Sequence, residues 1–354
     1  MSLAYRAIDW NRQKRLYDLT LGGVLALSLG MFVGVSLLVS PNVTAETLVI
    51  RGCSVSALLL LHVILCIGPL ARLNARFLPL LYNRRHLGVT MFLLALVHGV
   101  FAIVQFHALG NENPLVSVFT AYQRDYRVFA DGKVNLANFP FEPFGVAALG
   151  ILFLMAATSH DFWLRNLGAS FWKTMHLGVY AAYGLVLVHV ALGALQAERS
   201  AVYPVLLALG FAFVAGLHLT AARKEARLEN TNTRTEQDGF VSVCRVEEVA
   251  EGRGKVVFVM GQRVALFRHQ ARIFATSNAC RHQGGPVGEG RIVDGCITCP
   301  WHGWNYQPED GCSPPPFKEV LATFVTKVIG DRVWVKARAN PLGKRCAGSV
   351  VATL

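Results

Sequence analysis

Two short stretches of the sequence decide the fold of its last third: Cys280–Gly285 reads CRHQGG, and Cys299–Trp304 reads CPWHGW. Each stretch contains one cysteine and one histidine, and the glycines and prolines that favour tight turns stand beside them. The candidate ligands are Cys280, His282, Cys299 and His302. Two thiolates and two imidazoles on two loops indicate one metal site with four ligands.

The sequence around these loops has the pattern of a small antiparallel β domain. From Gly239 the chain forms short runs with a period of two and many β-branched residues. The runs are FVSVCRV, KVVFVM, RVALFRH, ARIFATS, TFVTKVI and RVWVKA. Because the Cys/His pairs lie in glycine-rich loops between such runs, we expect a β domain over residues 239–340 and a tail over 341–354.

The grouping of the ligands bears on the identity of the metal. A mononuclear zinc site accepts two cysteines and two histidines, but zinc fingers usually supply them as a cysteine pair and a histidine pair. Here each loop supplies one of each. This grouping fits a [2Fe–2S] cluster in which the two cysteines bind one iron and the two histidines bind the other. Zinc, or no metal, is the alternative at this stage.

The spacing C-x-H-x₁₆-C-x₂-H and its surroundings, NACRHQGGPVGEG and CPWHGWNYQPEDG, resemble the Rieske family. Rieske proteins of the cytochrome bc type have an additional cysteine in each loop, where this sequence has Gly285 and Trp301. The domain is therefore similar to the ferredoxin type of ring-hydroxylating dioxygenase systems. This resemblance implies a potential toward the low end of about −150 to +300 mV. Arg281 replaces the proline usual in that family, and its charge is expected to raise the potential slightly.

The first two-thirds of the chain has a different composition. The protein has 354 residues, of which 53% are hydrophobic and 16% charged, whereas a soluble domain has about 25% charged residues. Six stretches lack Asp, Glu, Lys and Arg: Leu19–Ser40, Gly52–Ala71, His86–Asn111, Pro143–Ser159, Thr174–Ala197 and Ser200–Ala222. Each is near the roughly 20 residues that a helix needs to cross a bilayer. We expect an integral membrane protein with an all-α bundle of six helices over residues 19–222, a tail over 1–18 and a linker over 223–238.

Positive charges predict the orientation of this bundle. Thirteen Lys and Arg residues lie in the N-terminal tail and after the second, fourth and sixth stretches, against five on the other side. The positive-inside rule therefore places both termini in the cytoplasm, and we expect a bacterial inner membrane. This topology, with anionic lipid as a neighbour, explains much of the net charge of +12, so nucleic-acid binding is not expected. Six of the eight cysteines follow the last stretch, on the reducing side, where stable disulfides are not expected.

Histidines within the apolar stretches indicate haem. They occur in RRHLGVTMFLLALVH, which ends at His98, and in FWKTMHLGVYAAYGLVLVH, which ends at His189. In the expected orientation His86 and His176 lie near the inner surface, and His98 and His189 lie about 18–20 Å further out. Imidazoles from two helices of a bundle can hold haem iron. On straight helices, however, the members of each pair are offset by about 120° or 220°, so spacing alone does not establish two haems.

Residues from about 52 to 197 resemble the ferric reductase-like transmembrane domain. The matching features are the run from Arg84 to His98 and the paired histidines of the fifth stretch. The resemblance implies two b-type haems, one held by His86 and His176 and the other by His98 and His189. The other histidines of the bundle are expected to form hydrogen bonds between helices. They are His62, His107 and His218.

The two parts together predict a protein that passes electrons from a cytoplasmic donor through the cluster and the haems to an acceptor outside. No Gly-x-Gly-x-x-Gly follows a strand, so we expect a separate flavoprotein reductase, or quinol, as donor. The sequence does not identify the acceptor. The long segment His107–Glu142 is expected to cap the outer haem or to dock the acceptor. A membrane-anchored Rieske carrier for a cytoplasmic oxygenase, and a redox sensor, are the alternatives. Whether the chain is itself an enzyme is left open.

Overall fold

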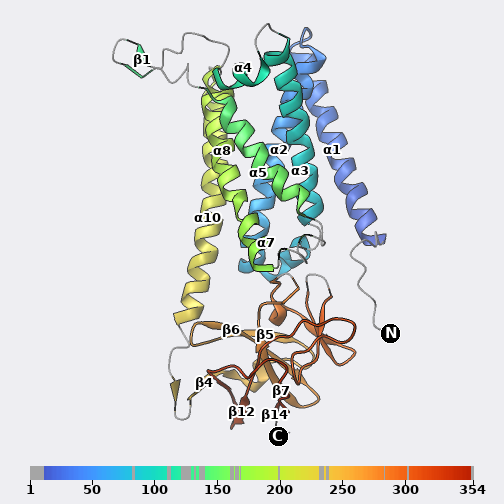
Figure 1. Cartoon of the computed structure of the whole chain (residues 1–354), viewed down its shortest axis with the longest axis vertical. Helices are drawn as coiled ribbons and strands as arrows, with labels where there is room; N and C mark the ends of the chain where they lie inside the picture. Colours follow the sequence, from blue (N-terminus) through green and yellow to red (C-terminus); the bar gives the residue numbers. More distant parts are fainter. Residues whose placement is uncertain are drawn as a thin grey trace. The chain divides into compact units, whose positions relative to one another are not determined.

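The computed structural model describes residues 12–81, 84–109, 113–120, 129–130, 133–134, 140–159, 163, 167, 169–197, 200–230, 235–236, 239–282, 284–300 and 303–351. They form two compact units, divided between Leu219 and Thr220. One is helical and the other is mostly β structure (Figure 1). Each unit is described separately below.

The helical unit contains the six apolar helices expected from the sequence. They are α1 (Arg12–Val39), α2 (Ala45–Leu73), α3 (Arg84–Ile103), α5 (Glu142–Ala157), α8 (Gly178–Leu192) and α10 (Val202–Asn230). Five apolar helical spans are long enough to cross a membrane, and α5, with 16 residues, is shorter. The chain is therefore an integral membrane protein, as predicted. The described part has more than six helices because short ones accompany these: α4 (Pro114–Thr120), α7 (Ala169–His176) and α9 (Ala194–Ala197).

Two of the expected helices are not regular along their length. The π-helix η2 (Val104–Ala108) follows α3 directly. The fifth expected helix is interrupted at Leu177, because α7 ends at His176 and α8 begins at Gly178. Arithmetic for a straight helix therefore does not give the relative directions of His176 and His189.

The last helix extends beyond the end expected for the bundle. Helix α10 continues past Ala222 to Asn230, so the segment expected as a linker from residue 223 begins as helix. The residues RKEAR at positions 223–227 are nearly all strong helix formers. They carry no apolar stripe, which is why periodicity alone did not show the helix.

Apolar side chains of five helices, among them Val214 of α10, form the core of the bundle. Helix α2 contributes Leu61 and Leu65, and α8 contributes Ala182 and Tyr183, all buried. Helices α3 and α5 complete this cluster. Helix α1 lies at the edge of the bundle (Figure 1) and packs against α2, where the side chains of Leu29 and Phe32 lie close to Gly52.

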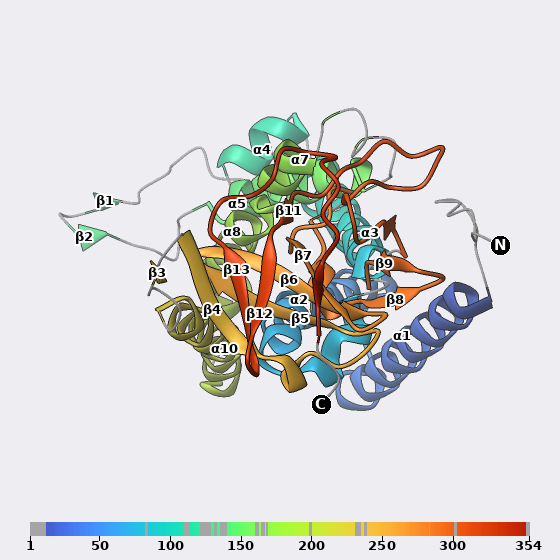
Figure 2. The ribbon, with the colours of Figure 1, turned by 90° about the horizontal axis from the view of Figure 1, so that it is seen from below.

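The β unit is a sandwich of two antiparallel sheets with a third, smaller sheet. One sheet has the order β11-β7-β6-β5, and β14 also pairs with β7. The second has the order β12-β13-β4-β3, and Figure 2 shows β12, β13 and β4 side by side. The strands are β3 (Thr235–Glu236), β4 (Phe240–Arg245), β5 (Gly254–Val259), β6 (Gln262–His269), β7 (Arg272–Ser277), β11 (Thr323–Phe324), β12 (Thr326–Ile329), β13 (Arg332–Lys336) and β14 (Ser349–Val350). Each of the six predicted runs contains at least one of these strands, so the small all-β domain is confirmed.

The third sheet carries the segment between the two candidate loops. Its order is β10-β9-β8, from β8 (Arg291–Val293), β9 (Cys296–Thr298) and β10 (Asn305–Tyr306). Asp294 and Gly295 join β8 to β9, and both have positive φ, 51° and 77°. These angles are those of a type I′ turn, for which Asp-Gly is a preferred sequence.

The core of the sandwich consists of aliphatic side chains from both large sheets. Leu266 on β6, Ile273 on β7 and Val333 on β13 are fully buried in it. Both faces of β6 are buried, because Ala265 and Phe267, the neighbours of Leu266, belong to a second apolar cluster.

Replacing Leu266 by alanine tests this core. We expect the change to destabilise the β unit by about 2–5 kcal/mol, because it removes buried methyl groups and leaves a cavity. Amide hydrogen exchange in β6 and β7 should then accelerate by roughly 30- to 3,000-fold. Leu342→Ala, at a side chain that is 62% exposed, is the matched control. Equal acceleration in the two variants would contradict this assignment of the core.

Candidate metal centres

The two candidate cluster loops close through the same pair of backbone hydrogen bonds. In the first, the Cys280 N–H donates to the Gly285 carbonyl at 2.8 Å, and the Gly284 N–H donates to the Cys280 carbonyl at 2.6 Å. In the second, the Cys299 N–H donates to the Trp304 carbonyl at 2.8 Å, and the Gly303 N–H donates to the Cys299 carbonyl at 3.0 Å. The two cysteines thus occupy equivalent places in equivalent loops.

A glycine four residues after each cysteine makes this closure possible. Gly284 has φ +74° and Gly303 has φ +70°, a backbone conformation in which other residues are strained. The pattern C-x₃-G in both CRHQG and CPWHG is therefore a requirement of the loop backbone. The glycine position is the same in both loops, but the histidine position is not. The histidine follows the cysteine by two residues in the first loop and by three residues in the second.

The two thiols are buried in a cluster of apolar side chains. Cys280 is 3% exposed and Cys299 is 2% exposed, and they share this cluster with Trp304, Tyr306 and Leu321. None of the eight cysteines, all of which are described, forms a disulfide. Burial without a disulfide leaves both sulfur atoms available as thiolate ligands of a metal.

Tyr306 connects the first cysteine to the second loop. Its hydroxyl lies 3.2 Å from the Cys280 Sγ and accepts a hydrogen bond from the Arg281 N–H at 3.0 Å. Burial raises the pKa of Tyr306 above its ordinary value, and Cys280 and then Cys299 add to the shift. The hydroxyl is therefore protonated, and it is the donor when Cys280 is a thiolate.

An aromatic stack holds the histidine of the first loop. The rings of His282 and Trp304 are parallel within 5°, with centroids 4.3 Å apart. The Trp304 indole N–H donates to the Ser313 hydroxyl at 3.0 Å, and Phe317 packs against the same ring at 4.3 Å. His302, the fourth candidate ligand, lies outside the described residues. Without it, no three Cys, His, Asp or Glu side chains of the described residues form a metal site.

The donor set nevertheless fits an iron–sulfur cluster. Two buried cysteines in equivalent loops and an imidazole oriented by stacking are the donors that a mixed Cys/His cluster uses. The site therefore suits thiolate and imidazole ligands and an ion softer than magnesium or calcium.

In the helical unit, the structure brings His98 on α3 and His189 on α8 together. Their ring centroids are 6.3 Å apart, with an angle of 75° between the ring planes. An imidazole nitrogen lies about 2 Å from a metal that it binds, so this separation leaves room for one iron between the two rings.

Each of these two rings is held through its other nitrogen. The His98 Nδ1 donates to the Ile50 carbonyl at 3.1 Å, and the His189 Nδ1 donates to the Phe141 carbonyl at 2.9 Å. A carbonyl oxygen only accepts, so Nδ1 carries the proton and Nε2 presents a lone pair in both residues. This is the tautomer of a histidine that binds metal through Nε2.

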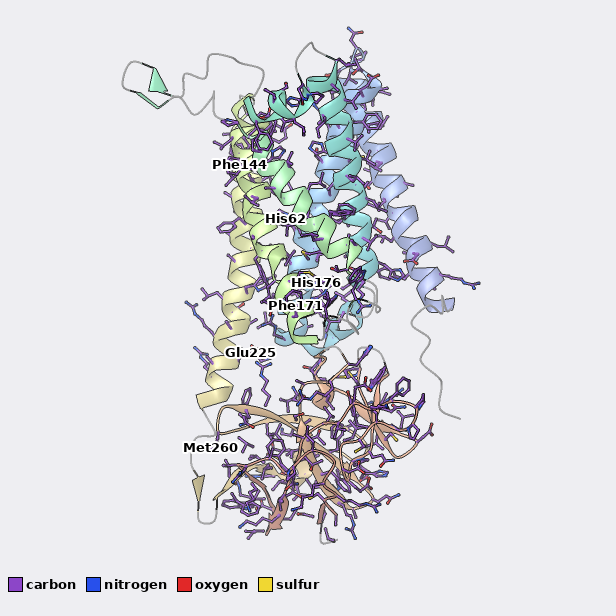
Figure 3. The ribbon with its side chains drawn as sticks, in the orientation of Figure 1. His62, Phe144, Phe171, His176, Glu225 and Met260 are labelled. Carbon is purple, nitrogen blue, oxygen red and sulfur yellow. The ribbon has the colours of Figure 1, made fainter. Side chains whose placement is uncertain are left out.

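His176 has the same arrangement at a different level of the bundle. Its Nδ1 donates to the Trp172 carbonyl at 3.0 Å, and the two rings stack with centroids 3.8 Å apart. Its Nε2 is buried, and no described residue forms a hydrogen bond with it. Figure 3 shows His176 near the end of the bundle where α7 lies, and His62 further along the bundle. A buried nitrogen with a lone pair and no donor fits a metal ligand.

His86 has a carboxylate partner on α1. Its Nδ1 lies 2.7 Å from the Asp18 Oδ1 on α1, and among the described residues no ring contact joins it to His176. Asp18 is a residue that the sequence reasoning missed, although it is the last acidic residue before the first apolar stretch. A carboxylate at Nδ1 is a common partner of a histidine that binds metal through Nε2.

The remaining histidines of the bundle have hydrogen-bond partners on neighbouring elements. His62 has partners at both ring nitrogens, the Leu58 carbonyl at 2.8 Å and the Tyr183 hydroxyl at 3.0 Å. The His107 Nδ1 contacts the Ser117 hydroxyl at 2.9 Å, and the His218 Nε2 donates to a carbonyl of α2 at 3.1 Å. These contacts join η2 to α4 and α10 to α2, as polar bridges between helices do in membranes.

Comparison with known families identifies both parts of the chain. Residues 239–325 match the family described as Rieske [2Fe-2S] domain, and residues 51–187 match the family described as ferric reductase like transmembrane component. Both resemblances drawn from the sequence are therefore confirmed, and with them a [2Fe–2S] cluster.

Relatives of the β unit include small carriers and parts of larger proteins. The ferredoxin component of the alkene monooxygenase system of Xanthobacter autotrophicus is 30% identical over 115 residues, which are 32% of this chain and 94% of that protein. Cholesterol 7-desaturase of Caenorhabditis elegans is 35% identical over 86 residues, 23% of this chain and 20% of the desaturase. Among solved structures, the ferredoxin of carbazole 1,9a-dioxygenase from Nocardioides aromaticivorans IC177 is 21% identical and matches with a TM-score of 0.27, covering 28% of this chain and 100% of that one.

Tyr306→Phe should lower the midpoint potential of the cluster. The change removes a hydrogen bond to a cysteine sulfur, and such bonds favour the reduced, more negative cluster. A net hydrogen-bond contribution of about 0.5–1.5 kcal/mol corresponds to roughly 20–60 mV for one electron. A redox titration followed by electron paramagnetic resonance measures it, with Tyr203→Phe, at an exposed tyrosine, as control. An unchanged potential would show that the contact with Cys280 is not a hydrogen bond to the bound cluster.

Proposed function

The chain belongs to the ferric reductase-like transmembrane family through its helical unit and to the Rieske [2Fe–2S] family through its β unit, and we propose that it conducts electrons across the membrane. In this proposal electrons pass from a cytoplasmic donor to the cluster, then through b-type haem to an acceptor on the outer side. The facing pair His98 and His189, 6.3 Å apart with both Nδ1 atoms bonded to carbonyls, is the observation that carries the proposal.

The cluster is held by one cysteine and one histidine from each loop. We assign Cys280 and Cys299 to one iron and His282 and His302 to the other, in agreement with the donor types of a Rieske site. The cluster supplies storage of a single electron. The protein residues supply two buried thiolates, the hydroxyl of Tyr306 and a stacked imidazole, which together set the potential and exclude water from the sulfur side.

The haem ligands form an outer and an inner set. His98 and His189 hold the outer haem, and haem supplies one-electron transfer within the bilayer when it is bound there. The inner set is His176, whose buried Nε2 has no hydrogen-bond partner among the described residues, together with His86, as the family resemblance implies. Asp18 then fixes the tautomer of His86 as the backbone carbonyls fix the tautomers of the outer pair.

The sequence supports this proposal's electron donor and its membrane location. The donor rests on a motif that the sequence lacks, and the location rests on the distribution of positive charges. The sequence has no Gly-x-Gly-x-x-Gly after a strand, so a soluble flavoprotein reductase or quinol supplies the electrons. Both termini lie in the cytoplasm of a bacterium with the bundle in the inner membrane. The bundle occupies residues 19–222 and the cluster domain residues 239–340. The acceptor is on the outer side, where this proposal also places residues 107–142, half of which are outside the described part.

A second function is favoured by one comparison. The alkene monooxygenase ferredoxin component is similar over 94% of its length, and its name places it in an oxygenase system. The β unit would then serve a cytoplasmic oxygenase, and the helical unit would be an anchor. The two functions differ in one respect, since only electron conduction requires haem in the bundle.

Reduction of haem through the cluster tests the proposal. The full-length protein, purified with ample haem supply, should show a b-type absorbance band in the reduced-minus-oxidised spectrum and two irons per cluster in addition to haem iron. A reductase that reduces only the cluster should then reduce the haem in the same molecules. A protein with cluster and no haem would support the anchor instead, and haem that stays oxidised beside a reduced cluster would support a sensor.

Separate removal of the two kinds of ligand should separate the two signals. His98→Ala and His189→Ala should each lose the outer haem absorbance and keep the cluster signal. Cys280→Ala should lose the cluster signal and keep the haem, and haem reduction by the reductase should fall by at least tenfold. Absorbance spectra and electron paramagnetic resonance of the same samples measure both. His62→Ala, at a histidine with other partners, is the control and should keep both signals.

A further inference from the structure

The ring of His189 lies against the first turn of α5. Its Nδ1 donates to the carbonyl of Phe141, the residue that caps α5, at 2.9 Å. One turn later, a Cβ atom added to Gly145 would lie 2.8 Å from both the Nδ1 and the Cε1 of His189, closer than side-chain carbons approach. Only glycine at this position therefore allows the imidazole edge to lie against the helix. Figure 3 marks this turn by Phe144.

The other side of the same ring is in contact with a phenylalanine. The Phe141 ring lies 5.3 Å from the His189 ring, at an angle of 48°. A Cβ atom added to Gly193, which follows α8, would lie 2.5 Å from the Phe141 Cδ2. The place of the Phe141 ring thus depends on a second glycine. A methyl group at Gly145 would push the imidazole directly, and one at Gly193 would push it through the Phe141 ring.

These contacts hold the Nδ1 edge of the imidazole and its ring, and they do not involve its Nε2. The Nδ1 is bonded, one edge lies on Gly145 and one side faces Phe141, so the ring cannot rotate about its Cβ–Cγ bond without a clash. The Nε2 remains, with the His98 ring 6.3 Å away between centroids. The hydrogen bond at Nδ1 also makes Nε2 a stronger donor to a metal.

We propose that Phe141, Gly145 and Gly193 are positioning residues that form a slot for His189 and fix the orientation of its imidazole. This inference rests on the proposed function, in which His189 is an axial ligand of the outer haem. Partners of a metal-binding histidine set its tautomer and ring direction, and through them the potential of the metal. The slot would therefore set the potential and the low-spin signal of the outer haem without touching the haem.

Substitution of two glycines of the same helix tests the slot. Gly145→Ala and Gly150→Ala both replace glycine by alanine in α5, but a Cβ at Gly150 would have nothing within 4 Å. In the full-length haem protein, Gly145→Ala should change the g-values and the midpoint potential of the outer haem, or lose that haem. The inner haem and the cluster should be unchanged. Gly150→Ala should match the wild type in every signal.

A second pair keeps the proposal testable if Gly145→Ala does not accumulate in the membrane. Gly193→Ala should shift the same outer-haem signals, and Gly184→Ala, on α8 with nothing within 4 Å of its added Cβ, should not. The slot is overturned if Gly145→Ala or Gly193→Ala behaves as its control does, or if the inner haem is lost to the same extent. A wild-type protein without haem would instead overturn the proposed function, so the two failures are distinguishable.

Discussion

A histidine that binds a metal through one ring nitrogen must have the other nitrogen bonded to the protein, and the helical unit is built around this requirement. Inside a bilayer no water satisfies Nδ1, so a backbone carbonyl or a carboxylate has to do so. Three candidate ligands use carbonyls, of Ile50, Phe141 and Trp172, and the fourth uses Asp18. The close approach of α5 to α8 and the place of α1 beside α3 both serve these bonds.

In the β unit, backbone turns hold the candidate ligands of the cluster in position. Two loops closed by the same pattern of backbone hydrogen bonds bury the two thiols in one apolar cluster. A glycine with positive φ in each loop allows the backbone to turn tightly. Tyr306 then joins the loops from the strand that follows the second one. The result is a rigid donor set, which keeps the reorganisation that accompanies gain or loss of an electron small.

The sequence predicts the parts of this protein whose pattern is periodic or spaced. The strand runs, the apolar helices and the cluster loops follow from alternation, hydropathy and the spacing of the two Cys/His pairs. The sheet from β8 to β10 was missed because its strands have two or three residues, although Asp294–Gly295 is a hairpin sequence. The carbonyl partners of the histidines could not be predicted, because every residue has a carbonyl and only tertiary packing decides which one is near. The helical extension from Arg223 to Asn230 has no apolar stripe, so hydrophobic periodicity does not indicate it, although most of its residues are strong helix formers.

In a continuous α-helix the number of residues between two side chains sets both their distance along the axis and their angle about it. The turn at Leu177 changes this relation between His176 and His189. Around it the Leu177 N–H donates to the Thr174 carbonyl and the Tyr180 N–H donates to the Leu177 carbonyl, each at 3.1 Å. Such bonds between residues three apart wind the chain by about 120° per residue instead of about 100°. A turn of this kind also rises by about 2.0 Å per residue instead of about 1.5 Å. Overwinding three residues therefore rotates His189 about the axis by roughly 60° relative to His176 and moves it along the axis by roughly 1.5 Å. Such a turn changes the angle between the two candidate ligands much more than the distance between them.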